Sequence, residues 1–115
     1  MKFKELKLLN LSNNDISDMK VLEKVKFDKL EKLNLGGNKI SNNINILENA
    51  NFNELKELNL SSNNISDIEV LEKVRFEKLK ILILNDNKIS NINILENVDF
   101  KELKELNFSN NIYQI

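Results

Sequence analysis

The chain has 115 residues, of which 41% are hydrophobic, and its 17 Lys and Arg nearly balance its 18 Asp and Glu. This length suits one domain with a continuous core, and the near-zero net charge gives no broad positive field for nucleic acid or an anionic membrane surface. The sequence contains neither Cys nor His. Disulfides, the commonest metal ligands and the usual proton-transfer group are therefore missing, so we expect no cofactor, no metal site and no enzyme activity.

The first residues, MKFKELKLLNLS, are interrupted by Lys and Glu throughout. A signal sequence or a membrane span needs an unbroken apolar stretch, which this segment lacks. We therefore expect a cytoplasmic protein with neither a membrane partner nor a nucleic-acid partner.

One phrase recurs along the chain with a period of 24 residues and a single step of 25. Each copy begins at a Phe, and the last copy is incomplete. The predicted units are 3–26, 27–51, 52–75, 76–99 and 100–115. Each unit keeps the spacing L-x-x-L-x-L-x-x-N-x-I, except that the fifth has Phe108 at the third Leu and Tyr113 where Ile would stand. The sequence thus predicts one domain of five repeats without clear capping units.

Within each unit, the order of residues predicts a strand, a turn and a short helix. Leu58 and Leu60 lie two residues apart and so share one face of a strand. The SSNN run that follows favours a turn, because short polar side chains bond to the nearby backbone. The next segment, SDIEVLEKV, offers Ser66 or Asp67 as the cap of one or two helical turns.

Stacking of the units determines the predicted architecture. Parallel strands lie about 4.8 Å apart, whereas neighbouring helices need about 10 Å. The array must therefore curve, with the sheet on its concave side and the short helices on its convex side. The recurring Leu, Ile and Phe side chains fill the space between these layers, which no unit can bury alone.

Two columns of residues follow from the repeat. The column Asn14, Asn38, Asn63, Asn87 and Asn111 comes where the chain turns back, and we predict that these side chains satisfy buried backbone groups. The second column alternates with the buried leucines and points out of the concave face. Its members are Asn10, Asn34, Asn59 and Asn107, with Ile83 in the fourth unit. Ile81, two residues earlier on the same face, is also apolar. Either these residues simply favour strands, or they form an apolar anchor for a partner.

A row of glutamates recurs at one position of the unit, as Glu5, Glu54 and Glu102. Lysines beside them, such as Lys4 and Lys56, offset their charge, and no second acid is fixed opposite them. We therefore predict no catalytic pair of carboxylates.

The spacing L-x-x-L-x-L-x-x-N-x-I, kept along the whole chain, resembles that of the leucine-rich repeat family. The phrases NxISDI and LExV are similar to those of the protein phosphatase 1 regulators and the bacterial internalins, although the period here is longer. The resemblance implies an α/β solenoid, a right-handed superhelix of strands and short helices, that binds another protein on its concave sheet without catalysis. The residues implied to contact the partner are Leu8, Asn10, Lys32, Asn34, Glu57, Asn59, Ile81, Ile83, Asn85, Asp86, Glu105 and Asn107.

The uncapped ends support a second hypothesis. An array whose end units expose strand edges can associate end to end. The chain would then be a structural or self-assembling repeat, either a piece of a longer array or a consensus-like stack.

Overall fold

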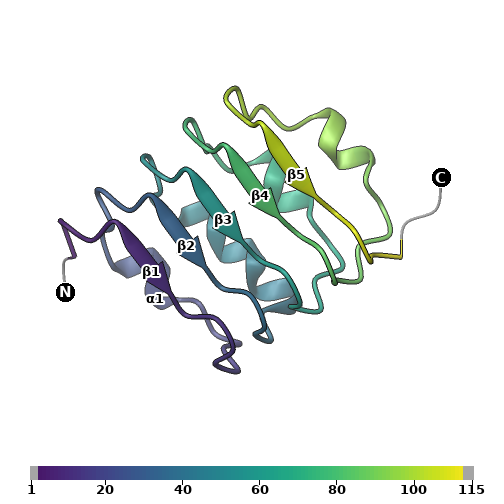
Figure 1. The fold of residues 1–115 in the computed structure, drawn as a ribbon, viewed down its shortest axis with the longest axis horizontal. Coiled ribbons are helices and arrows are strands. Elements are labelled where there is room, and N and C mark those ends of the chain that lie inside the picture. Colours follow the sequence, from purple (N-terminus) through teal and green to yellow (C-terminus); the bar gives the residue numbers. More distant parts are fainter. Residues whose placement is uncertain (1–2, 113–115) are drawn as a thin grey trace.

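The computed structural model describes residues 3–112 and shows a parallel sheet with short helical segments behind it (Figure 1). The five strands lie side by side in chain order. They are β1 (Leu8–Asn10), β2 (Lys32–Asn34), β3 (Glu57–Asn59), β4 (Ile81–Ile83) and β5 (Glu105–Asn107). The predicted α/β repeat solenoid is confirmed. Tyr113, which stands at the Ile position of the fifth unit, lies outside the described residues.

The strands pair without any shift in register. Leu33 lies opposite Leu9 on one side and Leu58 on the other, so equivalent positions of the repeat form rows across the sheet. Leu60 lies one residue beyond β3, and its N–H still donates to the carbonyl of Ile83 at 2.8 Å. Leu58 and Leu60 are both fully buried, as their spacing predicts.

Four helical segments connect the strands. They are α1 (Val21–Lys24), η1 (Ser41–Asn49), η2 (Glu69–Glu72) and η3 (Asn93–Glu96), and all but α1 are 3-10 helices. The tighter 3-10 turn suits such short connections. Neither predicted cap, Ser66 or Asp67, holds the cap position of η2, which is Ile68; Asp67 lies one residue earlier and accepts a hydrogen bond from the N–H of Glu69 at 2.9 Å. None of the helices within residues 3–112 is long and apolar enough to cross a bilayer.

The core lies between the sheet and the helical segments. Ile65, Ile68 and Leu71 are each at most 1% exposed. Phe27 is also buried, but Phe3 is 40% exposed although its ring stacks on that of Phe27 at 5.9 Å between centroids. The prediction that the Phe of every unit is interior is therefore wrong for the first unit, because no other described unit packs on its outer side.

The column of inner asparagines ties each unit to the next. Asn87 accepts hydrogen bonds from the backbone N–H groups of Asn63 at 2.8 Å and Ile65 at 3.1 Å. Its Nδ2 donates to the carbonyls of Leu60 and Leu84, each at 3.0 Å. One side chain thus satisfies backbone groups of two neighbouring units, in agreement with its predicted structural role.

Candidate functional site

The outward residues of the five strands form one face of the sheet, which we call the open face. The helical segments lie behind the opposite face (Figure 1). Strand pairing arranges the open face in two rows. The first row is Leu8, Lys32, Glu57, Ile81 and Glu105. The second row is Asn10, Asn34, Asn59, Ile83 and Asn107. All the predicted contact residues of the strands therefore lie on one surface.

The asparagines of the second row are bonded to their own turns. The Asn59 side-chain oxygen accepts hydrogen bonds from the N–H of Ser61 at 2.9 Å and from its hydroxyl at 2.7 Å. Asn10, Asn34 and Asn107 likewise accept from the N–H two residues later. Because a backbone N–H can only donate, the amide oxygen must face the turn. These asparagines therefore offer a partner their Nδ2 donors, a narrower role than the sequence suggested.

The fourth strand breaks this pattern. Ile83 cannot accept a hydrogen bond, and the backbone N–H of Asn85 has no acceptor among residues 3–112. The Asn85 side chain donates instead to Asp86 at 2.7 Å. The end of β4 therefore carries an unpaired backbone donor next to an apolar side chain. Sequence reasoning did not identify this donor, although the replacement of Asn by Ile two residues before Asn85 is its signal.

Ile81 and Ile83 are both half-buried and form an apolar strip that runs along β4 on the open face. Glu57 and Glu105 lie opposite Ile81 on the neighbouring strands. The strip thus has a carboxylate on either side. Leu8 is more exposed, at 59%, but it lies on the edge strand.

The glutamate row forms ion pairs between units rather than a reactive site. Lys29 contacts Glu5 at 3.1 Å, and Lys78 contacts Glu54 at 2.8 Å. The hydrogen bond from Lys78 lowers the pKa of Glu54 below its ordinary value, and Glu54 in turn raises the pKa of Lys78. The direct partners are lysines of the next unit, because stacking brings equivalent positions together. The charge of the predicted Lys56 also lowers the pKa of Glu54, but it contributes less than Lys78. Within residues 3–112, no group of Asp and Glu is arranged to hold a metal ion.

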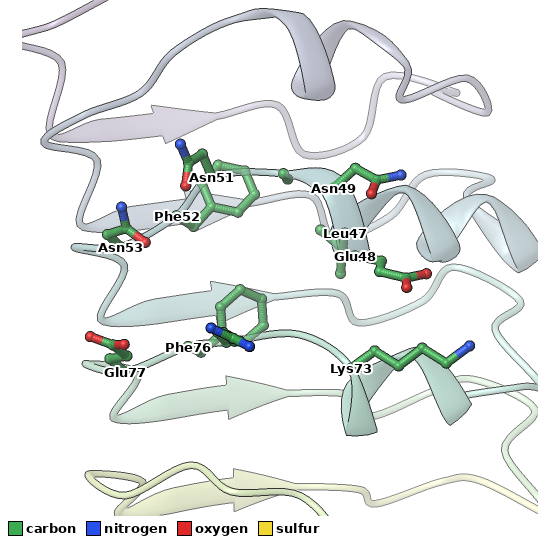
Figure 2. A pocket seen from close by; sticks show the side chains of 11 residues that line it. Leu47, Glu48, Asn49, Asn51, Phe52, Asn53, Lys73, Phe76 and Glu77 are labelled. Atoms are coloured by element: carbon green, nitrogen blue, oxygen red, sulfur yellow. The ribbon is translucent and has the colours of Figure 1, made fainter.

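A recess of about 510 Å³ lies on the loops that lead into β3 and β4. Figure 2 shows the rings of Phe52 and Phe76 in it, with Glu48 and Lys73 nearby. Both rings are almost fully buried, and the charges in the lining are mixed. The lining contains no Ser, Thr, Tyr, Cys or His, so it offers no hydroxyl, thiol or imidazole group for nucleophilic catalysis.

Comparisons with known proteins agree with the repeat. Two family models, both described as Leucine Rich Repeat, match residues 5–18 and 53–68 in one case and 29–50 in the other. A search of curated proteins gives no match.

Solved structures supply two similar proteins. The crystal structure of internalin C2 from Listeria monocytogenes matches 94% of this chain with a TM-score of 0.76 and 30% sequence identity. The internalin inlF of the same species matches 94% of the chain with a TM-score of 0.66 and 28% identity. The chain spans 44% and 36% of the lengths of these two proteins. The in-register repeat, the family models and the shared fold agree that this chain is built of leucine-rich repeats.

Proposed function

We propose that this chain is a non-enzymatic binding module that docks a partner protein on the open face of its sheet. Leucine-rich repeat arrays present extended surfaces of this kind for binding. The observation that carries the proposal is the interruption of the polar rows at β4. There, Ile81 and Ile83 replace polar residues, and the N–H of Asn85 is left without an acceptor among the described residues.

These features complement a particular kind of protein surface. A partner side chain of apolar character would cover the two isoleucines, and a nearby carbonyl or carboxylate would accept from the Asn85 N–H. Basic groups around that side chain would meet Glu57 and Glu105, which flank Ile81. The outward Nδ2 groups of Asn59 and Asn107 would donate further hydrogen bonds at the border of the contact. Such an arrangement has the apolar centre and polar rim of protein interfaces.

The rigidity of the sheet favours this binding mode. The side-chain oxygen of Asn59 is already fixed by Ser61, and the strands are locked in register. Binding therefore orders few additional side chains, so that less of the contact energy is lost to conformational entropy. The partner can be held by a small apolar centre because the surface around it is preorganised.

The double variant Ile81→Glu with Ile83→Glu tests the proposal. Proteins captured from a cell extract by the immobilised wild-type chain are identified by quantitative mass spectrometry, and the affinity of each purified candidate is then measured. We expect at least a roughly 30-fold loss of affinity, as for truncation of a central contact. The thermal midpoint should fall by only a few degrees, because both side chains are half-buried on the open face and the new carboxylate at position 81 repels Glu57 and Glu105 only weakly in contact with water.

The control is Val21→Glu, which places one negative charge, against two in the double isoleucine variant, on an apolar residue of α1 that is 59% exposed and lies away from the open face. This variant should retain the captured partner. Equal binding by the wild-type chain and the double isoleucine variant would overturn the proposal, as would a loss of binding that simply follows a loss of folding.

A further inference from the structure

Two columns of charged residues run along the edge of the sheet at which the strands begin. The first column is Glu5, Lys29, Glu54, Lys78 and Glu102. The second column, which immediately precedes the strands, is Lys7, Glu31, Lys56, Lys80 and Lys104. In the first three units both columns alternate in sign, and opposite charges meet between units, as where Lys56 contacts Glu31 at 3.5 Å. Each of these units has one Glu and one Lys in the two columns, so it adds no net charge to them.

The fourth unit breaks this order. Continued alternation would place an acidic residue at position 80, but the residue there is Lys80. Its N–H donates to the carbonyl of Lys56 at 2.8 Å, and its own carbonyl accepts from the N–H of Lys104 at 2.9 Å. These three residues therefore occupy adjacent positions, and we call them the lysine row. Neither Lys80 nor Lys104 forms an ion pair within residues 3–112.

The middle member of the row, Lys80, has the fewest acidic neighbours. The other two lysines of the row are each followed by a glutamate, whereas Lys80 is followed by Ile81. The first-column residue of its unit is Lys78, whose pKa is raised by Glu54 at 2.8 Å and, to a smaller extent, by Glu102. These two glutamates are therefore directed to Lys78. A positive charge without an acidic partner among the described residues thus lies at the start of β4, next to the apolar strip.

We propose that the lysine row binds an acidic segment of the partner protein, with a carboxylate on the ammonium group of Lys80. Neighbouring parallel strands lie about 4.8 Å apart, so the row spans about 10 Å, the length of three residues of an extended segment. Each ammonium group has three donors on a flexible stem and can follow such a segment. The inference rests on the proposed function, because the acidic segment continues the contact that begins at Ile81. The partner is then selected by the sign of its charge as well as by apolar contact.

Titration of the full-length, isotope-labelled chain with acetylated triglutamate tests the inference by NMR without the natural partner. At low salt this peptide should shift the resonances of the lysine row, whereas trilysine should leave them unchanged. Lys80→Glu should weaken triglutamate binding at least about fivefold, because an attraction becomes a repulsion. Binding should disappear near 1 M salt, where the screening length is about 3 Å.

The matched control is Lys88→Glu, which makes the same charge change in the same unit, at an exposed position beyond the other end of β4. Triglutamate binding by this variant should stay within about twofold of the wild-type value, because the change lies far from the row. Lys80→Glu also restores the alternation of charge, so its free energy of unfolding in urea should stay the same or rise. Equal weakening by the two variants would overturn the proposal, and so would the absence of triglutamate shifts in the lysine row.

A partner captured by the wild-type chain separates this inference from the proposed function. Loss of that partner by both Lys80→Glu and the double isoleucine variant supports the two together. If the double isoleucine variant loses the partner while Lys80→Glu retains it, the lysine row is not part of the interface and the proposed function stands. If only Lys80→Glu loses the partner, the row binds it and the role proposed for the apolar strip is wrong.

Discussion

The two asparagine columns of this protein use the same side chain in opposite ways. Asn63 of the inner column is fully buried, and its Nδ2 donates to carbonyls of its own unit and of the preceding one. Asn59 of the open face lies four residues earlier, is half-buried and accepts only from Ser61 of its own turn. The inner column joins units, whereas the outer column shapes one turn at a time.

This difference determines which column can vary. Every described member of the inner column is Asn, and several buried backbone groups depend on each internal member, such as Asn63 and Asn87. The outer column tolerates Ile83, since the one backbone group that loses its acceptor there, as far as residues 3–112 show, is the N–H of the half-buried Asn85. Replacement of Asn by an apolar residue is therefore costly in the inner column, whereas on the open face it costs little and can serve binding.

The largest effect is expected from Asn87→Leu, which breaks the inner column. It leaves the N–H groups of Asn63 and Ile65 without an acceptor among the described residues, at a cost of about 1 to 3 kcal/mol for each buried group. The carbonyls of Leu60 and Leu84 each keep a second amide donor, from Asn63 and Asn111. The free energy of unfolding in urea should fall by at least about 2 kcal/mol.

The control for that variant is Asn14→Leu. Asn14 is exposed, and its side chain bonds only to carbonyls of its own turn, those of Leu11 and Ser12. Its replacement should cost less than about 1 kcal/mol. Equal losses for the two variants would contradict the structural role of the inner column.

An intermediate effect is expected from Asn59→Ala, which breaks the outer column. The N–H of Ser61 loses its acceptor at a partly exposed site, and the loss should be about 1 kcal/mol of unfolding free energy. The binding of a partner centred on β4 should weaken only slightly. A loss as large as that of Asn87→Leu would show that the open-face asparagines also hold the array together.

The reverse change, Ile83→Asn, restores the outer column. The new amide oxygen can accept from the N–H of Asn85, as Asn59 accepts from Ser61. Stability should stay the same or rise by up to about 1 kcal/mol, while binding of the partner at β4 weakens. Calorimetric titration and urea unfolding separate the two effects. A variant that binds as tightly as the wild-type chain would contradict the proposed role of the strip.

The smallest effect concerns the ion pair of Glu54 and Lys78. The pKa of Glu54 is lowered from 4.5, so its contribution is present above that pH and is lost as the pH falls through the lower folded value. The pKa of Lys78 is raised from 10.5, so its contribution is present below that pH and is lost as the pH rises through the higher folded value.

The pair therefore stabilises the chain weakly between about pH 4.5 and 10.5. Urea unfolding of the wild-type chain and of Glu54→Gln at several pH values should give a small difference within this window and none well outside it. Glu48→Gln serves as the control, since Glu48 forms no ion pair within residues 3–112. A difference that does not vary with pH would contradict the assignment.

Much of the fold follows from the period of the sequence. The spacing of Leu55, Leu58 and Leu60 predicts a strand with a buried face, and repetition at a nearly constant interval predicts strands in register. The rows of the open face follow from the same alternation. Sequence reasoning did not identify the lysine partners of Glu5 and Glu54, because side chains 24 residues apart meet only after the units have stacked.

The sequence by itself therefore determined which residues face inward, which face outward and which asparagines satisfy buried backbone groups, because these properties are local and repeat with the unit. Only the structure showed that the open-face asparagines also bond to the backbone of their turns. The tertiary structure decided the 3-10 form of most connections, the exposure of Phe3 and Leu106 at the ends and the unpaired N–H of Asn85. Each of these depends on which neighbour is present in space, and a repeat read along the chain does not contain that information.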